Sequence, residues 1–475
     1  MLILIFLIPA AAGLLLFFRN KFLNNAALVF YSIVYLAVSV FELFHPSALT
    51  AYLKADTVSS FFMLILGFLF AGVALYNISF SSHDNVSGPS HTYYTIFFML
   101  FVAAMTGVIF STNLALLWVF IEATTLTSAY LIYYEKIKTS LEAAWKYIFI
   151  CSIGIALAFV GIILLTLGMG PGALNAGGSL FFADLYNNSG LMNSFWLKIS
   201  FVFIIFGFGT KMGLAPMHAW LPDAHSEAPS PVSAMLSGML LNTACLGILR
   251  VYKLMELTGN AHFARILMLA MGFLSIFVCA VYISRTNNYK RMLAYSSIEN
   301  MGIVMIGAAL GGIGLFAALL HILAHAFIKA SFFLTSGNVL TLYGSRLIGD
   351  VHGLYRRDKK TAWLWLLSFT GITGMPPFPL FISEFLIVKA FFDKGLIFPM
   401  AVFALLICII LYGISSKVLG MCFGQEAPAA APASEVKLGF MRYLPQAVFL
   451  SAMLIIGLVF PEPLVKIIRE AASLL

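Results

Sequence analysis

Residues 201–236 read FVFIIFGFGTKMGLAPMHAWLPDAHSEAPSPVSAML, an apolar run that is interrupted near its middle. Glycines on both sides of Lys211 weaken a helix here, and Pro216 breaks it. A broken helix leaves backbone groups without partners, which a membrane tolerates only where protein or a water-filled cavity covers them. Transporters often bind their ions at such interruptions. We therefore predict that Lys211 lies on an ion path inside a membrane protein.

The composition of the whole chain supports a lipid environment. Of the 475 residues, 61% are hydrophobic and only 10% are Asp, Glu, Lys or Arg, and the mean hydropathy is +0.99. An ordinary soluble domain carries about 25% charged residues. Apolar runs of about 20 residues, long enough to cross a hydrocarbon core, recur along nearly the whole sequence. We predict an all-α integral membrane protein with about fourteen transmembrane helices.

The connections between the apolar runs are short, and none is long enough to fold as a separate domain. The first run carries its basic residues after the apolar stretch rather than before it, which favours a retained helix over a signal peptide. The predicted spans are 2–18, 27–44, 57–77, 93–110, 113–134, 143–168, 195–215, 230–254, 263–284, 292–312, 314–343, 362–392, 397–421 and 444–461.

Charge and cysteine content narrow the function further. The net charge of +8 comes mainly from Lys and Arg in the short connections, where it sets topology and is no sign of nucleic-acid binding. More of these basic residues lie inside if both termini lie outside, so we expect that orientation. The five cysteines stand singly in apolar segments, so we expect small buried side chains and no metal or redox site.

A second interruption occurs in GITGMPPFPLFISEFLIVKAFF, residues 371–392, within the twelfth predicted span. It lies five spans after the break at Pro216, as expected for two five-helix repeats of inverted topology, because an odd number of spans reverses orientation. The seventh and twelfth helices are therefore predicted to be discontinuous. The predicted parts are N-terminal helices in 1–92, a first repeat in 93–254, a second repeat in 263–421, and a linker with the last helix in 422–475.

Glu122 and Glu384 lie inside predicted spans, where an ionised group costs several kcal/mol and is functional by default. Glu122 is far from either end of the fifth span, and Glu384 follows the second break. Glu122 could instead make a structural hydrogen bond to a neighbouring helix. We predict that both carboxylates belong to the ion path.

His321, His325 and Lys329 are spaced four residues apart, so they form one stripe of a helix. Histidine changes its charge near pH 7, and three titratable groups in register predict a proton relay. A zinc site is the alternative for the two histidines, but no further cysteine or carboxylate ligand is nearby, so we predict no metal.

Several weaker candidates could modulate the path. Lys146 could be a partner of Glu122 or a lysine that snorkels to the surface, and Lys389 lies near a helix end and could also snorkel. Acidic and histidine residues between the seventh and eighth spans could line a half-channel or cap a helix. Glu299 lies deeper in its helix and could face the path. The full set is Lys146, His218, Asp223, His225, Glu227, Asn242, Glu299 and Lys389.

Three stretches carry a resemblance to a known family: residues 210–242, TKMGLAPMHAWLPDAHSEAPSPVSAMLSGMLLN; residues 289–302, YKRMLAYSSIENMG; and residues 321–338, HILAHAFIKASFFLTSGN. They resemble the antiporter-like membrane subunits shared by respiratory complex I, the multi-subunit cation/proton antiporters and the membrane-bound [NiFe] hydrogenases. The resemblance extends over about residues 50–460.

Within that family the chain is most similar to component F of the hydrogenase and formate hydrogenlyase complexes. The stretches that carry this finer resemblance are LEAAWKYIFICSIGIALAFVG, LLNTACLGILR, AYSSIENMGI and ITGMPPFPLFISEF.

The resemblance implies roles for the residues already singled out. It pairs a glutamate on the fifth helix with a lysine on the broken seventh, continues along the eleventh helix and ends after the second break. The matching positions are Glu122, Lys211, His321, His325, Lys329 and Glu384. One position departs from the quinone-linked relatives, which often carry a lysine where this chain has Asn242. The central step would then use water or the histidines of the eleventh helix.

We expect a proton-translocating subunit of an energy-converting redox complex. The complex that we expect is a membrane-bound [NiFe] hydrogenase. The chain would perform no bond chemistry and hold no cofactor. Its partners would be other membrane subunits and, through them, a peripheral hydrogenase and iron–sulfur arm, in a bacterial or archaeal cytoplasmic membrane. The ending soon after the last span lacks a long lateral helix, which counts against the distal subunit of complex I.

Other functions stay open at this stage. A subunit of a sodium/proton antiporter, of a carbon dioxide uptake system or of a complex I-type NADH/quinone dehydrogenase would use similar residues. A membrane-embedded lipid transferase would need a polar catalytic cluster at one membrane face, whereas the ionisable residues here lie within spans. A purely structural scaffold would require that every buried charge be silent on mutation.

Overall fold

The structure of the protein is a computed structural model that describes residues 2–14, 20–82, 88–170, 179–424 and 437–475. Helices account for nearly all of the described chain. Two short strands, β1 (Ala48–Thr50) and β2 (Leu53–Lys54), pair antiparallel in one connection. The prediction of an all-α protein is confirmed.

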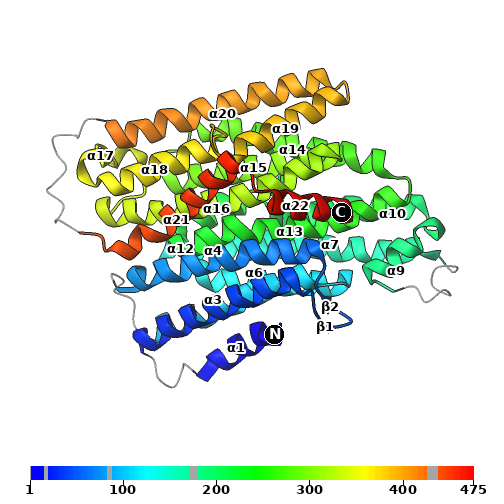
Figure 1. Ribbon diagram of the computed structural model, residues 1–475, viewed down its shortest axis with the longest axis horizontal. Helices are drawn as coiled ribbons and strands as arrows, with labels where there is room; N and C mark the ends of the chain where they lie inside the picture. The colour runs from blue at the N-terminus through cyan, green and yellow to red at the C-terminus, as the bar shows by residue number, and fades with distance from the viewer. Residues whose placement is uncertain (1, 15–19, 83–87, 171–178, 425–436) are drawn as a thin grey trace.

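The α-helices run mostly along the long axis of the molecule (Figure 1). In chain order they are α1 (Ile3–Ala11), α3 (Lys21–Phe44), α4 (Thr57–Ser82), α5 (Gly88–Phe110), α6 (Leu114–Ile132), α7 (Lys138–Gly168), α9 (Phe182–Asn187), α10 (Ser194–Met212), α11 (Trp220–Glu227), α12 (Ser230–Met235), α13 (Leu241–Leu257), α14 (Ala261–Ile283), α15 (Tyr289–Leu310), α16 (Ile313–Tyr343), α17 (Leu354–Arg357), α18 (Lys359–Ile372), α19 (Pro379–Asp393), α20 (Ile397–Phe423), α21 (Leu444–Val459) and α22 (Glu462–Leu474).

Short segments of other helix types complete the described elements. One π-helical segment, η3, joins α12 to α13. The labels and bounds are η1 (Ala12–Leu14), η2 (Ser189–Leu191), η3 (Leu236–Leu240), η4 (Ile348–Asp350) and η5 (Phe440–Arg442).

Eleven helices among the described residues are long and apolar enough to cross a membrane, or twelve if the bent pair α21 and α22 forms one span. This range is below the predicted fourteen because three predicted spans are short or divided in the structure. The apolar helix Ile3–Leu14 is too short for the criterion. The twelfth predicted span is divided into α18 and α19, of 14 and 15 residues. Over the described residues each predicted span nevertheless coincides with one helix or with consecutive helices; residues 15–18 of the first predicted span lie outside the described chain.

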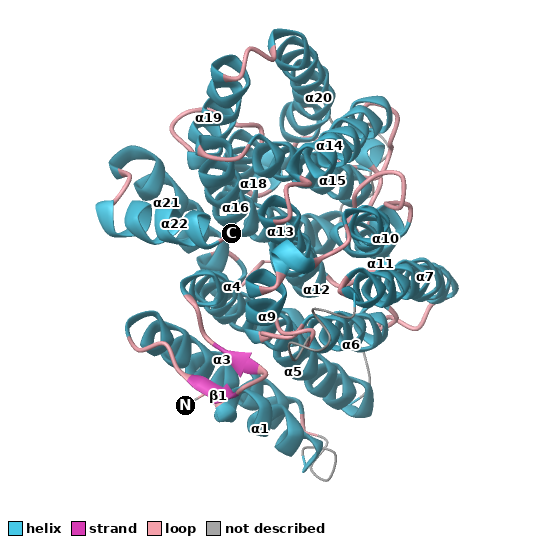
Figure 2. Ribbon diagram, turned by 90° about the vertical axis from the view of Figure 1, so that its right-hand side faces the viewer, coloured by secondary structure: helices cyan, strands magenta, loops and turns pink. Residues whose placement is uncertain are grey.

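The helices that carry His321, His325, Lys329, Asn242 and Glu299 lie in the middle of the molecule. Figure 2 looks along most of the helices and shows α13, α15 and α16 inside, with α1, α7 and α20 at the periphery. The apolar window of the continuous helix Ser230–Leu257 is 100% buried, compared with 28% for α20. Polar side chains in the middle are therefore shielded from lipid by other helices.

Both predicted breaks are present. Helix α10 ends at Gly213, whose φ of +81° favours glycine, and α11 begins seven residues later. Helix α18 ends just before Gly374, which has φ of +61°, and α19 begins at Pro379. A Cβ at Gly374 would collide with the Glu384 carboxylate, so the second break packs directly against a candidate site residue.

Candidate ion path

Lys211 lies in the last turn of α10, and its side chain is fully buried. Its ammonium donates hydrogen bonds to Thr125 Oγ1 of α6, at 2.9 Å, and to Tyr147 OH of α7, at 2.5 Å. The nitrogen also lies 4.6 Å from the centre of the Tyr147 ring, within the range of a cation–π interaction. Hydroxyls and an aromatic ring therefore hold this buried cation.

Glu122 lies one turn before Thr125 on α6 and is half-buried. Its carboxylate accepts hydrogen bonds from Thr125 Oγ1 at 3.2 Å and from Ser152 Oγ of α7 at 3.1 Å. Among the described residues no ion pair within 4 Å joins Glu122 to Lys211, although their charges interact. The Thr125 hydroxyl accepts from Lys211 and donates to Glu122, so the two predicted partners are linked through it.

Sequence reasoning missed Tyr147 and named its neighbour Lys146 instead. Tyr147 is fully buried and bonds Ser128 at 2.6 Å as well as Lys211. Lys146 points outward and forms ion pairs with Glu142 at 2.6 Å and Asp223 at 3.2 Å. Small residues at helical spacing mark the buried face of α7, and Tyr147 lies on that face. The buried residues are Ala143, Ala144, Tyr147, Cys151 and Gly154, so this spacing could have identified Tyr147.

Lys329, on α16, is the second fully buried lysine of the predicted path. Its ammonium donates to the Leu293 carbonyl oxygen at 2.7 Å and to Ser296 Oγ, both on α15. It also lies 6.0 Å from the centre of the Phe333 ring. Like Lys329, His321 and His325 are fully buried on this helix.

The two histidines of α16 have different surroundings. His321 bonds Ser383 Oγ at Nδ1 and Asn300 Oδ1 at Nε2, each at 2.9 Å. His325 has no hydrogen-bond partner at either ring nitrogen within the described chain. Buried polar atoms are nearly always hydrogen-bonded, to protein or to ordered water. His325 is thus a position where water can complete the hydrogen bonding.

His225 and Asn242 also have buried polar atoms without a partner in the described chain, as does His218 at Nδ1. Both ring nitrogens of His225 on α11, and Oδ1 of Asn242 on α13, are buried without a partner in the described part of the chain. His225 stacks on Phe333 at a centroid distance of 4.8 Å. Burial, together with the positive charges of Lys329 and Lys290, lowers the pKa of His225 to about 3, so its ring is neutral near pH 7.

Asn242 follows the π-helical segment η3, and its Nδ2 donates to the Gly238 carbonyl oxygen at 2.7 Å. A Cβ at Gly238 would lie 3.0 Å from the carbonyl oxygen of Ala326, which follows His325 in the chain. Such π-helical turns occur frequently at functional sites. Asn242 is therefore a polar residue close to α16.

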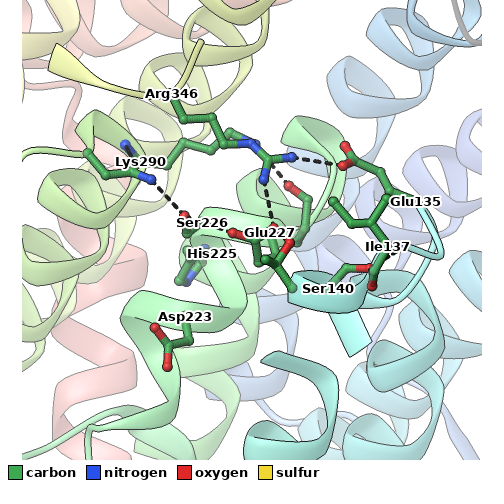
Figure 3. Close-up of polar contacts among 12 residues, drawn as sticks. Glu135, Ile137, Ser140, Asp223, His225, Ser226, Glu227, Lys290 and Arg346 are labelled. Atoms are coloured by element: carbon green, nitrogen blue, oxygen red, sulfur yellow. Dashed lines mark hydrogen bonds and ion pairs between the residues drawn. The ribbon is translucent and has the colours of Figure 1, made fainter. Parts of the chain in front are cut away.

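The acidic residues between α10 and α12 lie at the surface in ion pairs. Figure 3 shows Arg346 between Glu135 and Glu227, with Arg346 nitrogens 2.8 Å and 2.7 Å from the two carboxylates. Asp223 pairs with Arg291 and with Lys146. These contacts join the α6–α7 connection, α11 and the segment after α16. They hold these segments together, so Asp223 and Glu227 have a structural role.

Four candidates remain: Lys389, His218, Glu299 and Glu384. Lys389 pairs with Asp393 at 2.7 Å on the half-exposed end of α19, as a snorkelling lysine would. His218 lies in the connection between α10 and α11, where burial lowers its pKa. Glu299 and Glu384 are brought together around one small cavity.

Comparison with known proteins identifies the family. The sequence model described as "NADH:quinone oxidoreductase/Mrp antiporter, TM" matches residues 111–410, which contain every predicted path residue. The chain belongs to this family. The resemblance predicted from the motifs is confirmed.

Among curated relatives in this family, the Hydrogenase-4 component F homolog of Methylacidiphilum infernorum (isolate V4) is 31% identical over 92% of this chain and 91% of that protein. Hydrogenase-4 component B of Escherichia coli (strain K12) is 29% identical over 78% of this chain, but the match covers only 56% of that longer protein.

Solved structures confirm the antiporter-like fold. A chain of the archaeal membrane-bound sulfane sulfur reductase has a TM-score of 0.86 at 24% identity, covering 99% of this chain and 97% of that one. A chain of the Mrp complex from Dietzia sp. DQ12-45-1b also has 0.86, at 20% identity over 99% and 96%. A chain of respiratory complex I from Thermus thermophilus has 0.79, at 20% identity over 99% of both chains.

Proposed function

We propose that this chain is a proton-translocating subunit of an energy-converting redox complex of the membrane-bound [NiFe] hydrogenase kind. The observation that carries the proposal is the pair of fully buried lysines, Lys211 and Lys329, each held by neutral groups beside a broken helix. A buried ammonium without an ion pair is costly to keep charged. Such a group is suited to losing and regaining a proton.

Translocation begins, in this proposal, at Glu122 and Lys211. A charge change in a neighbouring subunit alters the electrostatic interaction between the two, which changes how tightly Lys211 holds its proton. Interactions of this kind act strongly inside a membrane, because the surrounding dielectric is low. The hydroxyls of Thr125 and Tyr147 keep the ammonium in place while its charge changes.

The proton then crosses the centre of the molecule. The unpartnered atoms of His225, Asn242 and His325 are suited to hydrogen bonds with water, which would join the two halves in place of the absent lysine. From His325 the proton reaches Lys329 on the same stripe and leaves through Glu384, beside the second break. His321 is hydrogen-bonded at both ring nitrogens, which fixes the position of α16 and so of His325 and Lys329.

The architecture proposed with this function has about fourteen transmembrane helices. The first and second five-helix repeats occupy residues 93–254 and 263–421 with inverted topology, flanked by 1–92 and 422–475. Both termini lie outside. Support comes from the two breaks, five predicted spans apart, and from the distribution of Lys and Arg.

The hydrogenase assignment rests on the component F homolog, which aligns over nearly its whole length. The partners proposed are other membrane subunits and, through them, a peripheral hydrogenase with iron–sulfur proteins, in a bacterial or archaeal cytoplasmic membrane. A sodium/proton antiporter is the second candidate, because "Na(+)/H(+) antiporter subunit A1" of Staphylococcus haemolyticus is 27% identical over 89% of this chain.

Two measurements test the proposal. The tagged chain, extracted from its membrane in mild detergent, should bring down a [NiFe] hydrogenase large subunit and iron–sulfur proteins, identified by mass spectrometry. Recovery of antiporter subunits without redox proteins, together with sodium-dependent exchange in vesicles, would favour the second candidate. In inverted vesicles, Lys211→Ala and Glu122→Gln should each abolish proton uptake, and full uptake in either variant would contradict the mechanism.

A further inference from the structure

A small cavity lies between the carboxylates of Glu299, on α15, and Glu384, on α19. Its volume is about 10 Å³, and Thr373 and three aliphatic side chains of α20 complete its lining. A volume of about 10–15 Å³ is what one water molecule needs. Two glutamates from separate helices thus line a cavity that can hold roughly one water molecule.

Within the described chain neither carboxylate has a hydrogen bond or ion pair to any other group; Glu299 is only 6% exposed, whereas Glu384 is partly exposed. The contrast is Glu42, a fully buried carboxylate on α3, which accepts from Ser47 N at 2.8 Å and Ser47 Oγ at 2.6 Å. A buried carboxylate without donors is costly in its ionised form, and two that face one cavity also repel each other.

Glu299 also lies next to Lys329 in the path. It follows Ser296, which accepts a hydrogen bond from Lys329, by one helical turn on α15. The Glu299 carboxylate shares the cavity with Glu384 and interacts electrostatically with both Glu384 and Lys329. Its neighbour Asn300 accepts from His321. Glu299 therefore occupies the position between the last lysine and the carboxylate after the break.

We propose that Glu299 is a proton carrier between Lys329 and Glu384, and that the two carboxylates share one proton across the cavity. The inference deepens the proposed function and rests on it. In the first step a proton leaves the Lys329 ammonium, which becomes a neutral amine, and binds a Glu299 carboxylate oxygen. In the second, Glu299 gives a proton to water in the cavity while that water gives one to Glu384.

The test uses the whole complex in inverted vesicles and compares Glu299→Gln, Glu384→Gln and the double variant. Each single variant should lower proton uptake by roughly 100-fold or more, at the lower end of what a positioned acid or base contributes. The double variant should be no worse than either single one, because both residues lie on one path. Glu42→Gln is the matched control and should keep full uptake.

A second readout separates proton sharing from packing. The infrared difference spectrum of the complex should contain a protonated-carboxyl band that shifts in heavy water and disappears in both single variants. Glu299→Asp, which keeps a carboxylate, should restore part of the uptake if Glu299→Gln disturbs assembly. Full uptake in Glu299→Gln, or loss in Glu299→Asp as complete as in Glu299→Gln, would overturn the inference. Full uptake in Lys211→Ala would instead show that the proposed function fails.

Discussion

The two halves of the molecule hold their buried lysines in different ways. In the first half, Lys211 lies on the broken helix and reaches Glu122, on an intact helix, through one hydroxyl. In the second half, the lysine lies on intact α16, and Glu384 belongs to the broken helix. A lysine therefore lies just before the first break, whereas a glutamate lies just after the second.

The helix dipole accounts for the first of these positions. Lys211 lies in the last turn of α10, where the negative end of the dipole favours a cation. Glu384 lies in the second turn of α19, whose first turn contains no acidic residue, so the dipole contributes little there. The second break acts through packing instead, because Gly374 leaves room for the Glu384 carboxylate. We infer that each break positions an ionisable residue of the path, but by a different means.

The largest expected effect comes from removing either lysine. Lys211→Ala and Lys329→Ala should each abolish proton uptake by inverted vesicles, because the two residues are successive stations on one path. Lys417→Ala is the matched control, since Lys417 also donates to a backbone carbonyl, that of Ile283 at 2.7 Å, but lies outside the path. If one of the two path variants kept full uptake, the halves would not act in series.

The next effect tests the hydroxyl link of the first half. Thr125→Val removes the group that joins Lys211 to Glu122, so uptake should fall by about tenfold, as expected for a hydrogen bond to a charged group. Thr127→Val is the control on the same helix, because Thr127 donates only to carbonyl oxygens of α6. Equal rates in the two variants would mean that Glu122 acts on Lys211 directly.

A smaller effect is expected at the corresponding contact of the second half. Ser296→Ala removes one acceptor of the Lys329 ammonium, but the Leu293 carbonyl oxygen remains. Uptake should fall by roughly threefold, within the net range of a single hydrogen bond. Ser331→Ala, whose hydroxyl bonds Ser368 of α18, provides the control. A loss as large as that in Thr125→Val would show that both lysines depend equally on side-chain hydroxyls.

The sequence was sufficient to predict the breaks and the buried charges, for a physical reason. A lysine or histidine far from the ends of a long apolar run is expected to face the protein interior, and a proline in the middle of such a run interrupts the helix. Lys211, Lys329 and both histidines of α16 are accordingly buried. The number of spans was less certain, because short and divided helices satisfy the same hydropathy pattern as one continuous helix.

The hydroxyl groups that hold the charges could not be predicted in the same way. A threonine or serine in a membrane helix can bond its own backbone one turn earlier, as Thr127 does, so its presence signals nothing. The contacts of Thr125 and Tyr147 with Lys211 depend on how α6, α7 and α10 pack together. The contact of Ser296 with Lys329 depends on how α15 packs against α16. Lys146 was misleading for a related reason, since one residue on a helix turns a side chain by about 100°.

The smallest effect is expected at the surface, where the ion pairs are partly exposed to water, unlike the buried lysines of the path. Arg346→Gln breaks both contacts of Arg346, to Glu135 and to Glu227. Partly exposed pairs contribute up to about 1 kcal/mol each, so the melting temperature in detergent should fall by roughly 2–4 °C. Arg265→Gln, which breaks a single and more exposed pair, should lower it less. Uptake should stay unchanged in both variants, because neither arginine lies on the path. A loss of uptake in Arg346→Gln alone would mean that this surface network takes part in transport and that the anchoring interpretation of Glu227 is wrong.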